Sequence, residues 1–316
     1  MKKVLLASTA LVMTAGVAAA DVTLSGYAEI GVFMVDDDDG TRDDLEFHSD
    51  FDVTFTLSGE TDNGLTFGAT IDLDEVGDDD TGGDAIANDG SPGSAVEEHS
   101  VFVSGAFGTL TMGDTDGAFD RVMQELGWGT ALADDHTTHA GFSGNGGLDG
   151  ANDGQILRYD YSLGDFAFAA SLELDDVDTN DDVFGIGAEY TADLGGASLN
   201  IAVGFQDGSV GGVDSDITGI SLDLALDSGF EARANFSTGD WDGTDGDDEH
   251  IGVGVAYLSG PLVVEANWGE NDRNGTTTDG FGLALNYDIG GGAVVMAGYG
   301  TDDTTDRLSV GLGLSF

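Results

Sequence analysis

The sequence contains no cysteine and only two prolines among its 316 residues. Without cysteine, no disulfide framework, thiolate nucleophile or cysteine-ligated metal site can form. The two prolines stand against 52 glycines, a combination typical of many strands joined by tight turns, because proline interrupts sheet hydrogen bonds and glycine suits turns. The fold must therefore be held together by backbone pairing and side-chain packing.

Basic residues are also scarce, with eight Lys and Arg against 61 Asp and Glu. This balance excludes nucleic-acid binding, since phosphate contacts need clustered Lys and Arg. Strong acidity is also typical of disorder, but the aromatic content of 9% and the regular alternation described below argue against disorder. Cations are the natural partners of such a chain.

Long hydrophobic runs are absent after residue 20. One apolar run, residues 4–17, follows Lys2 and Lys3 and ends in three alanines before Asp21, which predicts a secretory signal peptide over residues 1–20. A short membrane anchor is the alternative, but the run is below the roughly 20 residues that span a bilayer. The mature domain, residues 21–316, then keeps six arginines against 61 acidic residues, a formal charge of −55 (6 − 61).

Apolar residues recur at every second position in sixteen blocks of the mature chain, which is the period of a strand with two different faces. The apolar faces carry no charged residue, whereas the opposite faces carry many, so one side faces hydrocarbon or a dry core and the other faces water. These faces begin at Val22, Phe51, Leu65, Val101, Leu110, Leu157, Phe166, Phe184, Leu199, Ile220, Phe230, Ile251, Leu262, Phe281, Ala293 and Leu308.

The connections between the blocks alternate between short turns and longer segments. The long ones are residues 36–46, 76–97, 113–153, 175–182, 207–216, 239–249, 270–279 and 301–306. Aromatic residues on the apolar faces gather at both ends of the blocks, as at two membrane interfaces. Together these features predict an all-β fold, an antiparallel transmembrane β-barrel of 16 strands with both termini on the short-turn side. A barrel of this size encloses an aqueous channel.

Three segments resemble the Gram-negative general diffusion porins, in particular the alphaproteobacterial, Rhodobacter-like type. They are residues 21–28 (DVTLSGYA), 101–114 (VFVSGAFGTLTMGD) and 308–316 (LSVGLGLSF). The resemblance implies an outer-membrane homotrimer of 16-stranded barrels with the third long loop folded into each lumen. It also implies that acidic residues on this loop oppose basic residues on the wall, and that the terminal aromatic, here Phe316, serves assembly.

The third long loop, residues 113–153, is too long for a mere connection. Its residues Phe119, Val122, Met123 and Leu126 have the spacing of one face of a short helix. We expect this face to pack on the inner barrel wall, with Asp116 as the N-cap. Asp120, Gln124 and Glu125 should then meet pore water.

The residues expected at the pore constriction are loop acids and two inward-pointing wall arginines. They are Asp114, Asp116, Asp120, Glu125, Asp134, Asp135, Arg158 and Arg233. For each acid the alternative is a solvated surface charge, and for the arginines it is a wall salt bridge with a neighbour such as Asp160 or Glu231. A lumen lined by charge of one sign enriches counter-ions, so the channel should prefer cations.

Flexible loops with dense carboxylates suit Ca²⁺, although hydrated acidic loops explain them equally well. The candidate ligands are Asp36, Asp37, Asp38, Asp39, Asp78, Asp79 and Asp80. His136 and His139 resemble a pair of zinc ligands, but the sequence specifies no third ligand.

Two other functions stay open at the level of the sequence. A secreted calcium-binding adhesion protein is one, and it would be soluble without detergent. An outer-membrane hydrolase is the other, but no Ser, His and acid set has family spacing. We therefore predict a passive channel for ions and small hydrophilic solutes, with no catalysis and no required cofactor.

Overall fold

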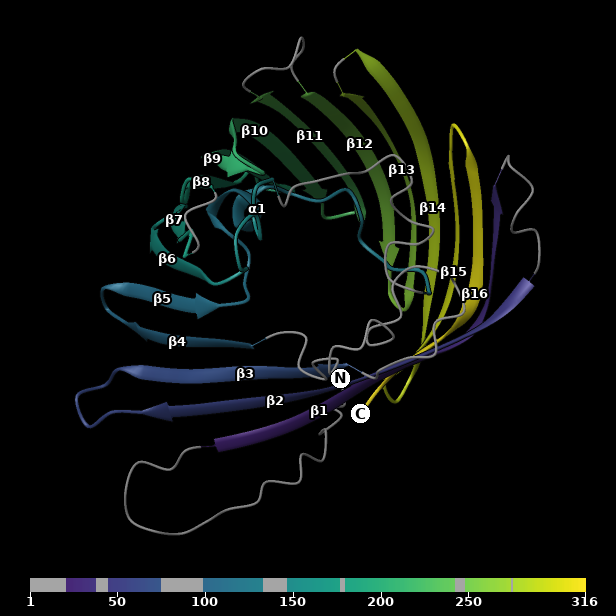
Figure 1. Cartoon of the computed structure of the whole chain (residues 1–316). Coiled ribbons are helices and arrows are strands. Elements are labelled where there is room, and N and C mark those ends of the chain that lie inside the picture. Colours follow the sequence, from purple (N-terminus) through teal and green to yellow (C-terminus); the bar gives the residue numbers. More distant parts are fainter. Residues whose placement is uncertain are drawn as a thin grey trace, which may run out of the picture.

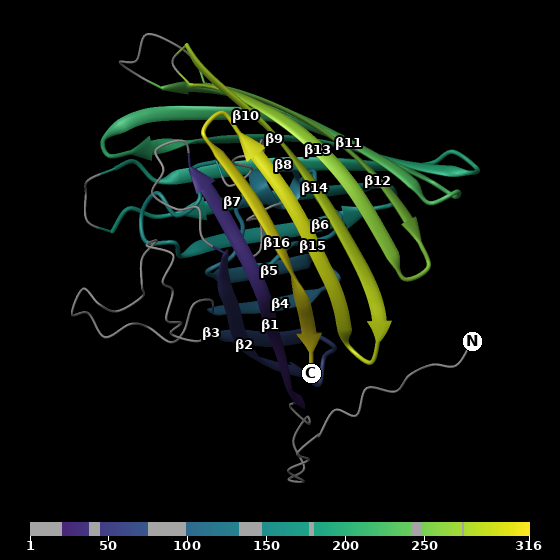
Figure 2. The same cartoon turned by 90° about the vertical axis from the view of Figure 1, so that its right-hand side faces the viewer.

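A computed structural model describes residues 21–37, 45–74, 99–132, 147–176, 180–241, 248–273 and 275–316. Sixteen strands in these ranges form one closed antiparallel barrel, in which each strand pairs with the next along the chain and β1 closes on β16. Figure 1 looks into the ring of strands, and Figure 2 shows the strands inclined along its side. The predicted 16-stranded antiparallel barrel is thus confirmed.

The strands are β1 (Asp21–Asp37), β2 (Leu45–Glu60), β3 (Thr66–Asp74), β4 (His99–Gly105), β5 (Gly108–Gly113), β6 (Ile156–Leu163), β7 (Phe166–Glu173), β8 (Val183–Asp193), β9 (Ala197–Val210), β10 (Val213–Leu226), β11 (Phe230–Trp241), β12 (Asp248–Ser259), β13 (Leu262–Arg273), β14 (Thr276–Gly290), β15 (Ala293–Asp302) and β16 (Thr305–Ser315). One short helix, α1 (Ala118–Val122), lies within the third long loop. No helix among the described residues is both long and apolar enough to span a membrane.

The alternation along each strand decides which side chains face outward. In β12 and β14 exposed and buried residues alternate, and the large apolar side chains are the exposed ones. Val253 and Leu283 are examples, and both remain exposed although they are aliphatic. A face of this kind is unstable in water and stable in hydrocarbon.

Aromatic side chains stand at both rims of this outward face. At the short-turn rim Phe230 and Tyr257 lie side by side on paired strands, with ring centroids 4.7 Å apart. At the other rim the rings of Phe281 and Tyr299 are 5.8 Å apart. At each rim, aromatic rings from neighbouring strands thus contact one another, at the positions expected from the sequence.

Three of the long connections prove to be tight hairpins, so their predicted lengths were wrong. Strands β9 and β10 continue through most of residues 207–216. Strands β13 and β14 do the same at residues 270–279, and strands β15 and β16 do so at residues 301–306. Apolar alternation stops where the strands leave the outward apolar band. Backbone pairing continues beyond it, because ladder hydrogen bonds do not require apolar side chains.

The core of the molecule lies inside the barrel, between α1 and the wall. Phe119, Val122 and Met123 are buried there with Ala169 of β7 and Ala202 of β9. Figure 1 shows α1 in the interior beside β7, β8 and β9. The third loop therefore folds into the lumen instead of projecting from the rim.

Candidate functional site

The third loop follows the inner wall over a long arc. It leaves β5 at Gly113, packs α1 against β7, β8 and β9, and ends its first described part at Leu132. A Cβ on either Gly31 of β1 or Gly311 of β16 would collide with the Leu132 side chain, at 2.1 and 2.6 Å. The loop thus reaches from one side of the lumen to the seam where the barrel closes.

Glycines on the inner wall make room for the apolar face of this loop. A Cβ on Gly204 of β9 or Gly219 of β10 would lie 2.7 to 2.9 Å from the Phe119 ring, and one on Gly187 of β8 would lie 2.5 Å from the carbonyl oxygen of Ala118. Real Cβ atoms do not approach so closely, so these positions need glycine. The predicted packing of Phe119, Val122, Met123 and Leu126 on the wall is confirmed, since all four are buried.

The helix itself is shorter than the pattern suggested, and its N-cap was assigned wrongly. The N-cap is Gly117, with no side-chain cap hydrogen bond. Its amide donates instead to Asp149 Oδ2, at 2.6 Å, on the returning arm of the same loop. The Asp116 side chain is exposed and lies 3.8 Å from Arg158.

The two wall arginines bind the backbone of the loop. Arg158 on β6 donates to the Asp116 carbonyl oxygen at 2.6 Å and to Asp160 Oδ2 at 3.0 Å. Arg158 therefore lies beneath the loop and holds it, whereas the resemblance implied a basic cluster opposite the loop acids.

Arg233 on β11 has a similar geometry. It pairs with Asp223 at 3.0 Å, not with Glu231, and donates to the carbonyl oxygens of Glu125 (3.1 Å) and Gly127. Its guanidinium also lies 4.4 Å from the centre of the Trp128 ring, a cation–π contact. The planar fork of arginine suits this simultaneous use of a carboxylate, carbonyls and an aromatic face.

Wall carboxylates hold the loop from the other direction, by accepting its backbone N–H groups. Glu265 on β13 is 3% exposed, and its Oε2 accepts the N–H groups of Trp128 and Gly129, both at 2.7 Å. Asn286 on β14 exchanges two hydrogen bonds with the backbone of Thr130, at 3.0 and 2.8 Å. A buried carboxylate is stable only with such donors, so these contacts fix both partners.

The returning arm is held in the same way. Glu173 on β7 is 1% exposed, and it accepts the N–H groups of Gly150 (3.1 Å), Asn152 (3.1 Å) and Gly154 (2.8 Å). Gln206 on β9 accepts the Leu148 N–H at 2.8 Å.

Two loop carboxyls have shifted acidity. Burial first, and then the neighbouring carboxylates of Asp116, Asp149 and Glu125, raise the pKa of Asp120 to about 7, although Arg158 acts in the opposite direction. Burial likewise raises the pKa of Asp149 to about 6, against the lowering effect of its hydrogen bonds from Gly117 and Gln206. The negative charge of the loop therefore depends on pH near neutrality.

Across the barrel, the wall is also acidic. Strands β2 and β3 stand half-way round the ring from β10 and β11, and the strand alternation turns Glu46, Asp50, Asp52 and Asp72 toward the lumen. The His48 ring on β2 pairs with the buried Glu29 of β1 at 3.1 Å. The loop acids thus face further acids across the lumen.

All five arginines in the described ranges lie within 4.0 Å of a carboxylate. The pairs beyond those already given are Arg121 with Asp160 and Glu189, Arg273 with Asp248, and Arg307 with Asp302. The positive charge of the lumen wall is therefore compensated locally, and the excess along the lumen is negative.

Several predicted residues cannot be placed. Those outside the described residues are Asp134 and Asp135, Asp38 and Asp39, Asp78 to Asp80, and His136 and His139. Asp36 and Asp37 form the end of β1. Within the described part of the chain, no group of three His, Asp or Glu side chains is arranged to hold a metal ion.

Five wall residues that hold the loop were not predicted to do so, and Glu231 was considered only as a salt-bridge partner of the arginines. They are Glu173, Gln206, Glu231, Glu265 and Asn286. Alternation places each of them on the inner face, and that was their only signal. Their partners are more than 100 residues away in several cases, as for Trp128 Nε1 and Glu231 Oε2, 2.6 Å apart. Nothing local in the sequence indicates such a pairing.

Phe316 lies at the closing seam on the short-turn side. Its backbone N–H donates to Gly26 of β1 at 2.9 Å, and its carbonyl oxygen accepts from Gly26 at 3.3 Å. The side chain is 70% exposed. The last residue thus combines an outward ring with backbone pairing across the seam.

Comparisons with known proteins agree with this architecture. A family model described as Gram-negative porin matches residues 7–307. A porin of Rhodobacter capsulatus is 29% identical over 94% of this chain and 99% of its own, and a porin of Fuscovulum blasticum is 25% identical over 87% and 92%. A solved porin structure matches with a TM-score of 0.69 at 24% identity, over 93% of this chain and all of that one, and supports the fold.

Proposed function

Because this chain belongs to the Gram-negative porin family, we propose that it forms a water-filled outer-membrane channel that favours cations over anions. Ions and small hydrophilic solutes would cross by passive diffusion through the lumen, past the third loop. The channel would be a passive one and would need no cofactor.

The cation preference is supported by the contacts of the arginines, whose positive charges are already paired. Arg158 and Arg233 are engaged with wall carboxylates and loop carbonyls. The loop and the inner faces of β2 and β3 carry further carboxylates, among them Asp116, Glu46 and Asp72, so acidic groups outnumber the arginines along the described lumen. A passage with an excess of one sign concentrates counter-ions and repels co-ions.

Screening sets the conditions under which this preference can be measured. The Debye length is about 8 Å at physiological ionic strength and about 3 Å at 1 M salt. A pore several ångströms in radius is therefore filled by the negative potential in dilute salt and largely screened in concentrated salt. The preference for K⁺ over Cl⁻ should decline accordingly.

Reversal potentials across a KCl gradient in planar bilayers test the proposal. We expect cation preference at about 0.1 M salt that declines toward the bulk mobility ratio near 1 M. A calcium chelator is included, because Ca²⁺ bound by acidic loops would lower the negative charge at the mouth. Anion preference in dilute salt under chelation would refute the proposal.

A loop variant identifies the source of the preference. Neutralising the loop acids should reduce the reversal potential in dilute salt more than it changes conductance at 1 M. The changes are Asp114→Asn, Asp116→Asn, Asp120→Asn and Glu125→Gln. An unchanged reversal potential would show that the constriction acids are not these residues.

We also propose that the mature protein is a homotrimer, that residues 1–20 are removed on export, and that Phe316 serves insertion. The trimer rests on likeness to the family. The outward ring of Phe316 at the seam is compatible with recognition by assembly factors. We propose as well that the acidic loops bind Ca²⁺, which the experiment with the chelator also tests.

A further inference from the structure

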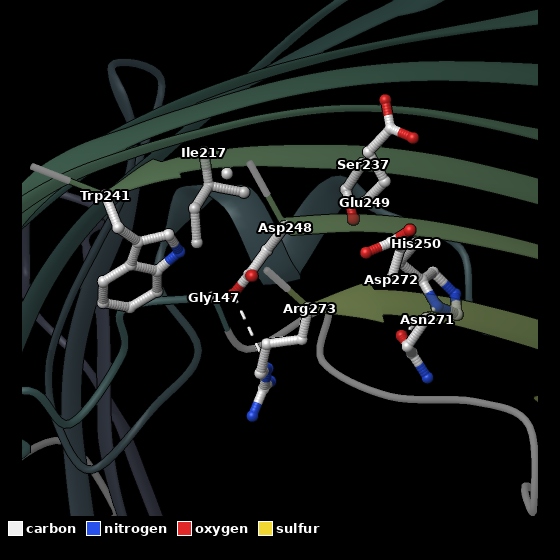
Figure 3. Close-up of a pocket in the computed structure, with 11 residues that line it drawn as sticks. Gly147, Ile217, Ser237, Trp241, Asp248, Glu249, His250, Asn271, Asp272 and Arg273 are labelled. Carbon is white, nitrogen blue, oxygen red and sulfur yellow. Dashed lines mark hydrogen bonds and ion pairs between the residues drawn. The ribbon is translucent and has the colours of Figure 1, made fainter. Parts of the chain in front are cut away.

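A cavity of about 120 Å³ opens on the inner face of β11, β12 and β13, near the ends that lie on the long-loop side. Its volume equals that of about four liquid water molecules, at ~30 Å³ each. Figure 3 shows the side chains that surround it. Those used below are Ser237, Trp241, Asp248, His250, Asn271 and Arg273. Strand alternation turns all six toward the lumen.

The polar groups of this cavity are held in fixed positions. The His250 ring is bracketed by Asn271, at 2.8 Å from Nδ1, and by Asn235, at 3.1 Å from Nε2. An imidazole held at both nitrogens cannot rotate. The wall behind the cavity is thus rigid, which lowers the entropic cost of binding a solute.

One carboxylate oxygen at this site has no donor among the described residues. Asp248 Oδ2 lies 3.5 Å from Arg273 Nε, the pair joined by a dashed line in Figure 3. The other oxygen, Oδ1, is buried and accepts no hydrogen bond from the described residues. Buried acceptors are normally satisfied, so this carboxylate has hydrogen-bonding capacity left, and a quarter of its side chain is exposed. The Arg273 side chain is 77% exposed, which leaves its terminal N–H groups accessible from the same cavity.

An aromatic wall completes the site. The Trp241 indole lies on the opposite side of the cavity from His250 and Asn271, next to Ile217 (Figure 3). The combination of an indole face with a carboxylate, a guanidinium, an amide and a hydroxyl suits a ligand that has an apolar C–H face and several hydroxyl groups.

We propose that this cavity binds neutral polyhydroxylated solutes, through one ring of a saccharide. One hydroxyl would donate to the exposed part of the Asp248 carboxylate while its neighbour accepts from Arg273, so the existing ion pair is bridged without being broken. A zwitterion would have to separate these two groups to use both charges. Four charged residues line the cavity. Asp248 and Arg273 are turned inward and cancel, whereas strand alternation turns Glu249 and Asp272 to the outer face. The balance on the inner side favours an uncharged ligand. This site goes beyond the proposed function, since binding here does not depend on cation preference.

Saturation-transfer NMR on the full-length mature protein in detergent, with maltose as the probe, tests this directly. We expect saturation of the sugar ring protons and about tenfold weaker binding in Asp248→Asn, because a hydrogen bond to a charged group is lost. Trp241→Leu should remove most of the transfer to the C–H face. The matched control is Asp240→Asn, which removes the same charge from an exposed residue beside Trp241 that does not line the cavity.

Each outcome decides the proposal. Heat-modifiable mobility on gels verifies that every variant is folded. Maltose binding that is weakened in Asp248→Asn and retained in Asp240→Asn supports the site. Absence of saturation transfer to maltose, or equal loss of binding in both variants, overturns it. Because the readout is equilibrium binding, it is independent of the reversal potentials that test cation preference.

Discussion

Removal of the wall groups that hold residues 128–130 should release this part of the third loop. The double variant Glu265→Ala with Asn286→Ala removes four hydrogen bonds to the loop backbone, two to a carboxylate and two to an amide. Each bond to the carboxylate contributes about 1.5–3 kcal/mol and each to the amide about 0.5–1.5 kcal/mol. The bond between Trp128 and Glu231 remains.

The sum lies between about 4 and 9 kcal/mol, and water entering the lumen recovers part of it. We take the lower bound of about 4 kcal/mol, which corresponds to a factor of about 10³ in the equilibrium constant for release. If the segment is released in about one molecule in 10⁴ of the wild type, it would then be released in about a tenth of the molecules of the variant. The barrel itself should stay folded, because its backbone ladders do not involve these side chains.

Single-channel recording in 1 M KCl measures this release, since changes of charge are then largely screened and conductance reports geometry. We expect a second, higher conductance level in the double variant and smaller effects in each single variant. Glu46→Ala is the control, because it removes a lumen carboxylate from β2, four strands round the ring from β14, and this residue is not part of the contacts to residues 128–130. A double variant that folds and shows only the wild-type level would refute the assigned role of Glu265 and Asn286.

Three further predictions follow from the site. Cation preference should fall as pH decreases from about 8 to 5, because the Asp120 carboxyl, with its pKa raised to about 7, becomes neutral below that value; Asp120→Asn should reduce this pH dependence of the reversal potential. Phe316→Asp should block insertion while export continues, so folded protein in outer-membrane fractions at normal amounts would contradict it. Gly187→Ala should displace α1 from the wall, since its Cβ would lie 2.5 Å from the Ala118 carbonyl oxygen; we expect altered conductance at 1 M KCl, and an unchanged channel would show that α1 does not limit the pore.

The strands could be predicted because their signal is local. Alternation within a block such as residues 51–58 depends only on neighbours two positions apart, and it located all sixteen strands. The same signal failed at residues 207–216 and 270–279, where both faces turn polar while backbone pairing continues. Side-chain pattern indicates where a strand meets an apolar medium, and it does not indicate where the ladder ends.

The candidate site was predicted less completely, because its contacts are not local. The apolar face of the third loop was identified from its helical spacing, and Phe119 and Leu126 are buried as expected. The role of Arg233 was not, because the sequence cannot show that its partners include a carbonyl oxygen more than 100 residues away. Asp116 failed as an N-cap because the Gly117 amide is satisfied by Asp149 from the returning arm.

The seam between β1 and β16 has a consequence for how the chain reaches its membrane. It pairs Tyr27 with Ser315, residues that lie nearly the whole described length of the chain apart, so the ring cannot close before Ser315 has been synthesised. Contacts of such sequence separation form late and slowly. Until then the outward apolar strands need protection from aggregation, and the large negative charge of the chain keeps unfolded molecules apart by repulsion. The acidity that we assign to ion selection would thus also serve the protein in transit, before any channel exists.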